Sequence, residues 1–199
     1  PTGTIASLDV QSGTTTADTL TVNGQVSAAG TLVLSGDNTI SGDLVVTGKL
    51  TSTSNTLTLG GNLSLSTNTG SFTANGGIIR FTGTGTQTVN PGLNGASPNS
   101  FATIDLAKTG GSISFITNPL TVTNLIQSNS NNFTISFIEN LSVTNGVVFN
   151  TAGTLTLGNA LTDTFAFVGG LTHTTGNTVL SDSLQTIDQD ISFGNLTLS

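Results

Sequence analysis

Residues 30–52, GTLVLSGDNTISGDLVVTGKLTS, contain three short apolar stretches separated by glycine, aspartate and asparagine. In the first stretch, Leu32 and Leu34 alternate with Thr31, Val33 and Ser35. Successive side chains of a β-strand point to opposite faces, so this alternation predicts strands with one buried face. Glycine, asparagine and aspartate favour turns. We therefore expect an interior filled by Leu32, Leu34, Ile40, Leu44, Val46 and Leu50, and corners at Gly36, Asp37, Asn38, Gly42, Asp43 and Gly48.

The same alternation continues along the chain. No segment shows apolar residues at i, i+3, i+4 and i+7, and the abundant Thr, Gly and Asn are poor helix formers. The sequence therefore predicts an all-β fold. The alternating apolar pairs are Leu20 and Val22, Leu44 and Val46, Leu57 and Leu59, Leu63 and Leu65, Ile113 and Phe115, Leu120 and Val122, Ile135 and Phe137, Leu155 and Leu157, and Leu196 and Leu198.

Two all-β arrangements fit these strands: a sandwich of antiparallel hairpins, and a parallel β-helix with about 20–25 residues per coil. Three observations favour the β-helix. The two-residue hairpin signal Asn-Gly is rare, occurring at Asn23, Asn75, Asn94 and Asn145. The chain has no Trp, Tyr or Cys, the marker residues of immunoglobulin-type sandwiches. It also repeats internally, as stacked architectures do.

The internal repeat relates TLTLGGNL at 56–63 to TLTLGNAL at 154–161. It predicts one solenoid over residues 1–199, divided into two related units of about 98 residues, 1–98 and 99–199. Nine or ten coils at a strand spacing of about 4.8 Å would make a rod about 45 Å long. The expected aromatic interior consists of Phe72, Phe81, Phe101, Phe115, Phe133, Phe137, Phe149, Phe165, Phe167 and Phe193.

The longest break in the strand pattern is NPGLNGASPNS, residues 90–100. Its two prolines donate no N–H to a strand ladder, so the segment is expected to bulge from one coil. Such a projecting loop is a candidate partner-contact site. Its candidate residues are Asn90, Pro91, Asn94, Pro98 and Asn99.

Charge excludes several function classes. Charged residues are 7% of the chain, the net charge is −7, and the cations are Lys49, Arg80 and Lys108 alone. Three scattered cations cannot form the clustered basic surface that nucleic acids or anionic membranes require. No apolar run approaches the roughly 18 residues of a membrane-spanning helix. We expect no nucleic-acid partner and no membrane insertion.

The residues capable of catalysis are few. His173 is the only histidine, and we expect it to face solvent among threonines. Asp188 and Asp190 would share a face if they lay on a strand, as a β-helical glycoside hydrolase would need, but no aromatic or cationic residue lies nearby to grip a sugar. Asp37 and Asp43 could chelate calcium, although turn formation explains them better. The chain is expected to have no catalytic residue, metal or cofactor.

Repeated Thr-x-Thr triplets suggest a third hypothesis, because a flat array of threonines on one solenoid face could order water and bind ice. Threonine is also a favoured residue at solvated strand positions, and the triplets are irregularly spaced. They are Thr19/Thr21, Thr56/Thr58, Thr121/Thr123, Thr154/Thr156 and Thr172/Thr174.

Several stretches carry a family resemblance: NTLTLGGNLSLSTNTGSFTANGG (55–77), GTGTQTV (83–89) followed by FATIDLAKTGGSISF (101–115), and LTVTNLIQS (120–128). They resemble large secreted bacterial β-strand-repeat surface proteins of the filamentous-haemagglutinin and autotransporter-adhesin type. The resemblance implies a right-handed parallel β-helix at the cell surface, acting in adhesion, matrix or filament building. It supplies no catalytic residues.

These observations together predict a non-catalytic extracellular protein that stacks end to end with copies of itself or with further repeats of the same chain, and that contacts a host or matrix surface. The alternating Leu196 and Leu198 place the candidate stacking edge near residue 198. An exposed strand edge with an open core favours such pairing. A carbohydrate-active β-helix of the tail-spike or lyase type is the alternative, and ice binding is the third hypothesis.

Overall fold

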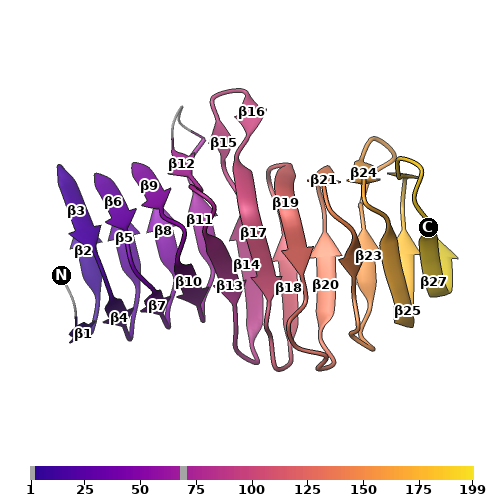
Figure 1. Ribbon diagram of the computed structural model, residues 1–199, viewed down its shortest axis with the longest axis horizontal. Helices are drawn as coiled ribbons and strands as arrows, with labels where there is room; N and C mark the ends of the chain where they lie inside the picture. The colour runs from indigo at the N-terminus through magenta and orange to yellow at the C-terminus, as the bar shows by residue number, and fades with distance from the viewer. Residues whose placement is uncertain (1–2, 68–70) are drawn as a thin grey trace.

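Parallel strands stack into a β-solenoid of about ten turns, which confirms the expected all-β parallel β-helix. The computed structural model describes residues 3–67 and 71–199, and this part of the chain has no helix. The coils follow one another along the long axis of the rod, with the N-terminus at one end and the C-terminus at the other (Figure 1).

Each coil crosses three faces, which we call A, B and C in chain order. Strands on face A are β1 (Gly3–Ile5), β4 (Leu20–Val22), β7 (Asn38–Ile40), β10 (Thr56–Leu59), β13 (Ile78–Phe81) and β22 (Val147–Val148). Strands on face B are β2 (Leu8–Val10), β5 (Val26–Ala28), β8 (Leu44–Val46), β11 (Leu63–Leu65), β14 (Thr86–Asn90), β18 (Ser112–Phe115), β20 (Thr134–Phe137) and β23 (Leu155–Leu157).

Face C carries β3 (Thr14–Ala17), β6 (Thr31–Leu34), β9 (Lys49–Ser52), β12 (Phe72–Thr73), β21 (Leu141–Val143), β24 (Thr164–Phe167) and β26 (Ser183–Gln185). Four longer strands turn a corner without a break. Two of them run from face C to face A, namely β17 (Ser100–Leu106) and β19 (Leu120–Ile126), and two run from face A to face B, namely β25 (Leu171–Leu180) and β27 (Ile191–Leu198). The ten-stranded hydrogen-bonded sheet therefore follows face A from β1 to β13 and continues on face C.

Coil length varies more than the expected 20–25 residues. Val26 pairs with Leu44, an advance of 18 residues, whereas Leu63 pairs with Val89, an advance of 26. The leucines at positions 20, 32 and 44 are 12 residues apart because each lies two faces further along an 18-residue coil with three six-residue sides.

A glycine marks each corner of the narrow coils. These glycines recur every six residues at Gly24, Gly30, Gly36, Gly42 and Gly48. A Cβ atom added at Gly24 would lie 2.6 Å from the carbonyl oxygen of Ala6, in the coil before it. The other four glycines meet backbone of the preceding coil in the same way. The six-residue glycine period therefore follows from the close backbone stacking at each corner.

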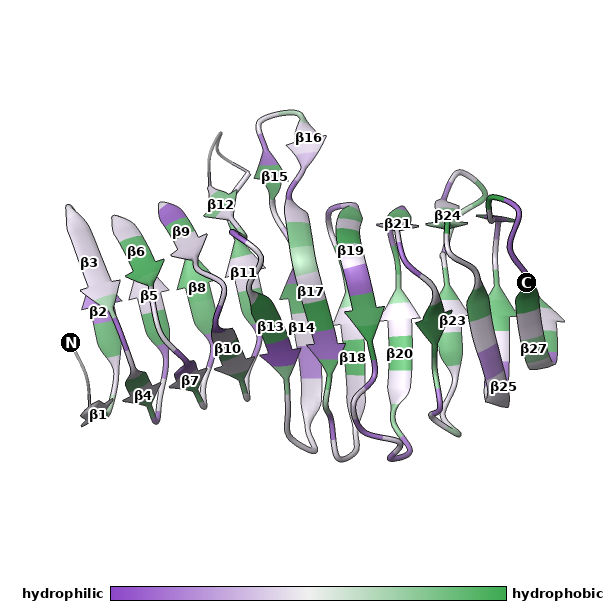
Figure 2. Cartoon of the chain, viewed as in Figure 1, coloured by the Kyte–Doolittle hydropathy of each residue, from purple (hydrophilic) through white to green (hydrophobic). Residues whose placement is uncertain are grey.

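The core is a continuous column along the rod axis. The strands alternate hydrophobic and polar residues (Figure 2), and the predicted interior residues of 30–52 are all buried. Nine of the ten phenylalanines are buried, and Phe193 is half-buried. Phe115 and Phe137 stack with ring centroids 4.8 Å apart. Burying each such side chain contributes about 1.5–3 kcal/mol, so this column supplies much of the folding free energy.

Two sequence expectations need adjustment. Asn38 was expected at an outer corner but is buried at the start of β7, where its Oδ1 accepts a hydrogen bond from the Leu20 N–H at 3.1 Å. The segments that suggest a 98-residue unit lie on different faces, Leu57 on face A and Leu155 on face B. They therefore do not occupy equivalent places in their coils.

Candidate functional site

The segment 90–100 forms a hairpin that projects from the rod (Figure 1). Its strands β15 (Leu93–Asn94) and β16 (Ser97–Pro98) are antiparallel, unlike the solenoid strands. Pro91 and Asn99 are buried at its base, where the Asn99 side-chain amide donates to the Pro91 carbonyl at 2.9 Å. Asn90 accepts a hydrogen bond from Asn118 at 2.7 Å. Only Asn94 of the five predicted contact residues is fully exposed, so the other four anchor or flank the tip.

A groove with a volume of about 380 Å³ runs beside this hairpin on face C. Pro98 forms one wall, and Pro119, Leu120 and Leu141 contribute to the apolar remainder. Asn140 supplies a polar group to the groove, and its Oδ1 already accepts the backbone N–H of Thr164 at 2.7 Å. The hairpin and groove together make an uncharged surface with both apolar and amide character.

The carboxylates Asp188 and Asp190 do not lie on a strand. They belong to the turn between β26 and β27, and Asp188 adopts a left-handed backbone with φ of 52°. The expectation that strand alternation gives them a common face is therefore wrong. The Thr186 hydroxyl donates to the Gln189 carbonyl at 2.6 Å and closes this turn.

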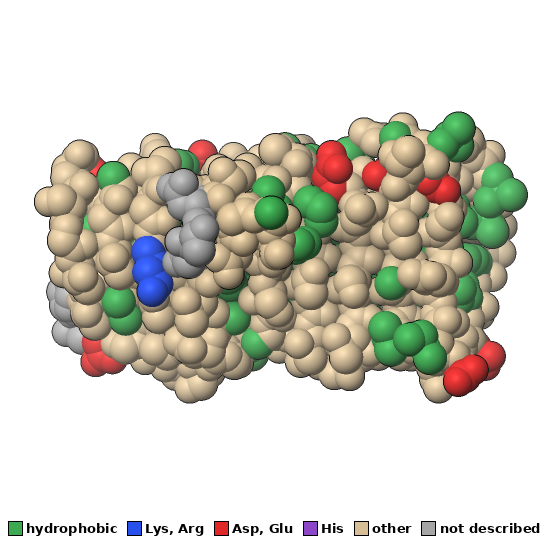
Figure 3. Space-filling view, turned by 90° about the horizontal axis from the view of Figure 1, so that it is seen from above, with side chains coloured by type: hydrophobic (Ala, Val, Ile, Leu, Met, Phe, Trp, Pro, Cys, Tyr) green, Lys and Arg blue, Asp and Glu red, His purple; other side chains and the backbone are tan. Residues whose placement is uncertain are grey.

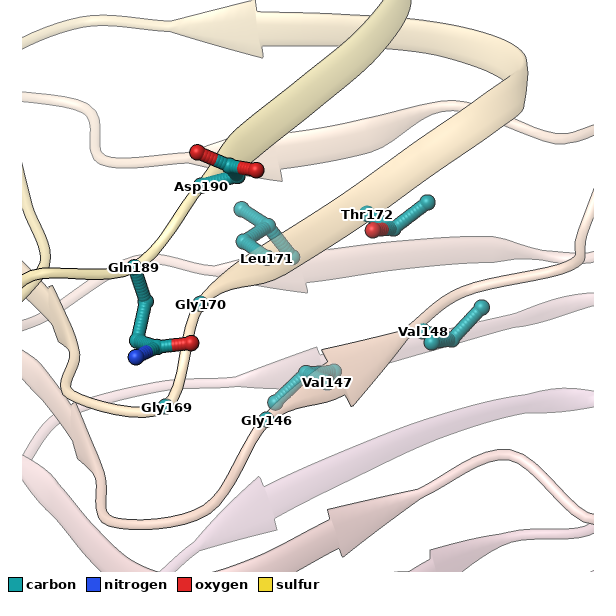
Figure 4. Close-up of a pocket in the computed structure, with 9 residues that line it drawn as sticks. All are labelled: Gly146, Val147, Val148, Gly169, Gly170, Leu171, Thr172, Gln189 and Asp190. Atoms are coloured by element: carbon teal, nitrogen blue, oxygen red, sulfur yellow. The ribbon is translucent and has the colours of Figure 1, made fainter.

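Asp190 instead borders a pocket of about 340 Å³ at the corner between faces C and A (Figure 4). Glycines form much of the wall, because Gly146 and Gly169 stack in successive coils and leave no room for side chains. The Gln189 side chain extends toward Gly169 (Figure 4). One carboxylate and one amide beside the apolar Val147 give this pocket hydrogen-bonding capacity, without a second acid among its lining residues for paired acid–base chemistry.

Asp37 and Asp43 lie at different corners and act as braces between coils. Asp37 accepts the backbone N–H of Thr56, and Asp43 that of Asn62, each at 2.8 Å. The same device recurs further along the rod, where a side-chain oxygen accepts an N–H of the next coil at Asn62, Asp105, Gln127 and Asn140. Within residues 3–67 and 71–199 no three acidic, His or Cys side chains gather as a metal site would require.

His173 is completely buried, so the expectation that it faces solvent is wrong. It follows Leu171 by two residues on β25 and therefore points inward with it. Its Nδ1 lies 2.8 Å from the Thr178 hydroxyl and its Nε2 lies 3.2 Å from the Thr151 carbonyl oxygen. The ring packs edge-on against Phe149. Burial lowers the pKa of His173 below its ordinary 6.5, although the hydrogen bond with Thr151 acts in the opposite sense.

This lowered pKa predicts an acid-sensitive fold. Between the folded pKa of His173 and 6.5 the unfolded chain binds more protons, so the free energy of unfolding falls as the pH drops below 6.5, by at most about 1.4 kcal/mol per pH unit. Urea unfolding at pH 7.0 and 5.5 measures this fall. His173 is the only histidine, so the variant His173→Gln should lose the dependence. Equal stability of the unsubstituted protein at both pH values would contradict the prediction.

A second buried group, Lys108, was not predicted. Its side chain is fully buried where the corner between faces A and B widens. The ammonium donates to the Gln87 side-chain oxygen at 2.8 Å and to the Gly85 carbonyl at 2.9 Å. Gln87 in turn donates to the Gly61 carbonyl at 2.7 Å. Burial lowers the pKa of Lys108. The sequence signal was Gln87, which alternates with Val89 and therefore had to point inward.

The five Thr-x-Thr triplets lie on different faces: three on A, one on B and one on C. The structure instead aligns a different set on face B. One column runs through Thr86, Ser112, Thr134 and Thr154, and a second through Thr88, Ser114, Ser136 and Thr156. All eight face outward. General strand geometry places such hydroxyls about 4.8 Å apart along a column and about 6.6 Å between columns.

The edge near residue 198 is open, as the sequence suggests. Leu196 is 46% exposed and Leu198 73% exposed, and β27 pairs with β25 alone among the described strands. Hydrophobic side chains also gather at this end in the space-filling view (Figure 3). Elsewhere that view shows mostly uncharged surface with isolated charged side chains.

Comparisons of the chain with protein-family models, with curated proteins and with solved structures find no match. Among the described residues there is no helix long and apolar enough to cross a membrane.

Proposed function

We propose that the chain is a non-catalytic structural or adhesive element of an extracellular fibre, in which β-solenoid coils stack end to end. The observation that carries this proposal is the open edge of β27. It offers unpaired backbone groups and the apolar Leu196 and Leu198 in the same orientation in which each earlier coil receives the next one. Such an edge is a template for further strands. Copies of this chain or further coils of the same chain would complete it.

The outer surface supports an extracellular structural role. It is rich in Ser and Thr and poor in charge, and 7% of the residues are charged. The resemblance of its repeats to secreted bacterial surface proteins places such a fibre at a bacterial surface. The projecting hairpin, with exposed Asn94 at its tip and the face C groove beside it, is the proposed contact for a host or matrix surface.

Assembly is tested with the purified chain at rising concentration. We expect sedimentation to show growing oligomers and negative-stain images to show rods longer than one subunit. The variant Leu198→Asp should abolish growth, because it places a charge against the uncovered core. The matched variant Ser114→Asp adds the same charge on an outward position of β18, in the middle of the rod, and should assemble normally. A protein that stays monomeric at high concentration would contradict end-to-end stacking of copies.

A second candidate function, ice binding, is favoured by the two hydroxyl columns on face B. The columns are flat, uncharged and regularly spaced, as a surface that orders water would need. The measurement is thermal hysteresis of the protein, compared with the variants Ser114→Tyr on the array and Thr39→Tyr on face A. Activity lost in the first variant and kept in the second would support this function, and a protein without thermal hysteresis would rule it out.

A further inference from the structure

The first and the last coil share a corner that the coils between them lack. On passing from face A to face B, the inward positions Ile5 and Leu8 are three residues apart, and so are Phe193 and Leu196. In the second coil the corresponding step, from Val22 to Val26, takes four residues. In the coils that follow it takes four to seven. These include the steps from Ile40 to Leu44, Leu59 to Leu63, Phe81 to Gln87, Leu106 to Ile113, Phe149 to Leu155 and His173 to Thr178.

The matching corner lets the two end coils align residue by residue. Residues 191–198, ISFGNLTL, overlay residues 3–10, GTIASLDV. In this alignment Phe193 meets Ile5, and Leu196 meets Leu8. Every inward position except Gly3 carries an apolar residue on both sides, and the small Gly194 and Ala6 coincide at the corner. Like residues stack on like in the interior of the rod, as the Phe115–Phe137 pair illustrates.

Both surfaces are uncovered and apolar. Ile5 is 36% exposed at one end, and Leu196 and Leu198 are exposed at the other. Among the described strands, β1 pairs with β4 alone and β2 with β5 alone. No charged side chain points inward in residues 3–10 or 191–198, so the two surfaces would meet without burying a charge.

We propose that a second copy of this chain docks head to tail, its β1 and β2 adding as parallel strands to β27. Thr4 of the incoming copy lies opposite Ser192. Asp9 lies opposite Thr197. The tenth coil contributes strands to faces A and B only, so these two faces carry the joint. All copies point the same way, and the resulting fibre is polar. This inference rests on the proposed function, since it specifies how end-to-end stacking occurs.

Paired cysteines test the register, because the chain has no cysteine of its own. Chains carrying Thr4→Cys are mixed with chains carrying Ser192→Cys under mild oxidation, and likewise Asp9→Cys with Thr197→Cys. Paired strands bring Cα atoms about 4.8–5.5 Å apart, within the range that a disulfide spans. Both mixtures should give a disulfide-linked dimer on non-reducing gels.

The crossed mixtures are the matched controls. Thr4→Cys with Thr197→Cys, and Asp9→Cys with Ser192→Cys, place the thiols on different faces. We expect about tenfold more dimer from the matched than from the crossed mixtures, because docking holds matched thiols at high effective concentration. Equal cross-linking in the crossed mixtures, or efficient dimerisation of the Ser192→Cys chain alone, would overturn the head-to-tail register while leaving assembly intact. Absence of both assembly and cross-links would overturn the proposed stacking as well.

Discussion

Replacing Gly36 with alanine should lower the free energy of unfolding by about 2–4 kcal/mol. A Cβ atom at this position would overlap the carbonyl oxygen of Asp18 in the coil before it. The clash is with backbone, which cannot rotate away as a flexible side chain could. The Gly36 carbonyl also accepts the Asn38 side-chain amide at 2.6 Å, so a shift of this corner would disturb the buried asparagine as well. Chemical denaturation followed by circular dichroism measures the loss.

The matched control for this substitution is Gly85→Ala. A Cβ atom at Gly85 would meet nothing within 4 Å, and Gly85 does not have a positive φ. Its carbonyl keeps its hydrogen bond from Lys108 when the side chain changes. We expect a change within about 0.5 kcal/mol. If Gly36→Ala and Gly85→Ala cost the same, coil stacking does not depend on glycine at the corners.

The glycines also show how far the fold could be predicted from sequence. Alternation of apolar residues predicts strands, and turn residues predict corners, so the parallel stack and the aromatic interior follow from local patterns. The six-residue glycine period from Gly24 to Gly48 was a stronger signal, because it gives three sides per coil and an 18-residue advance directly. The leucine spacing of 12 hides this advance, since it counts two sides rather than three.

The candidate sites were harder to predict because they depend on which face each residue reaches. Corner length changes along the rod, so small insertions redirect everything that follows. The hydroxyl columns on face B are an example: Thr86 and Thr154 are far apart in sequence and lie on one face only because the intervening coils have particular lengths. His173 is different. Its position two residues after Leu171 was sufficient to place it inside the rod.

Replacing Lys108 with methionine should lower the free energy of unfolding by about 2–4 kcal/mol. Methionine nearly preserves the buried volume but removes the donor from the Gly85 carbonyl and the Gln87 side-chain oxygen, and from the more distant Gly83 carbonyl at 3.5 Å. Each buried acceptor left without a partner costs about 1–3 kcal/mol. Chemical denaturation measures the effect. Lys49→Met is the matched control, because Lys49 is exposed on face C, and it should change stability little.

The outcome for Lys108 distinguishes two physical accounts of a buried cation. Removing an ammonium from water is costly, and replacing a buried charge with an apolar side chain of similar volume often stabilises a protein. Here no carboxylate is among the groups that its ammonium contacts, which favours that account. Against it, Gln87 and Lys108 fill the corner where the step between faces lengthens from four residues to six and seven, and their hydrogen bonds satisfy carbonyls that have turned inward. We expect the second term to dominate. A Lys108→Met protein more stable than the original would show that desolvation of the ammonium outweighs these hydrogen bonds.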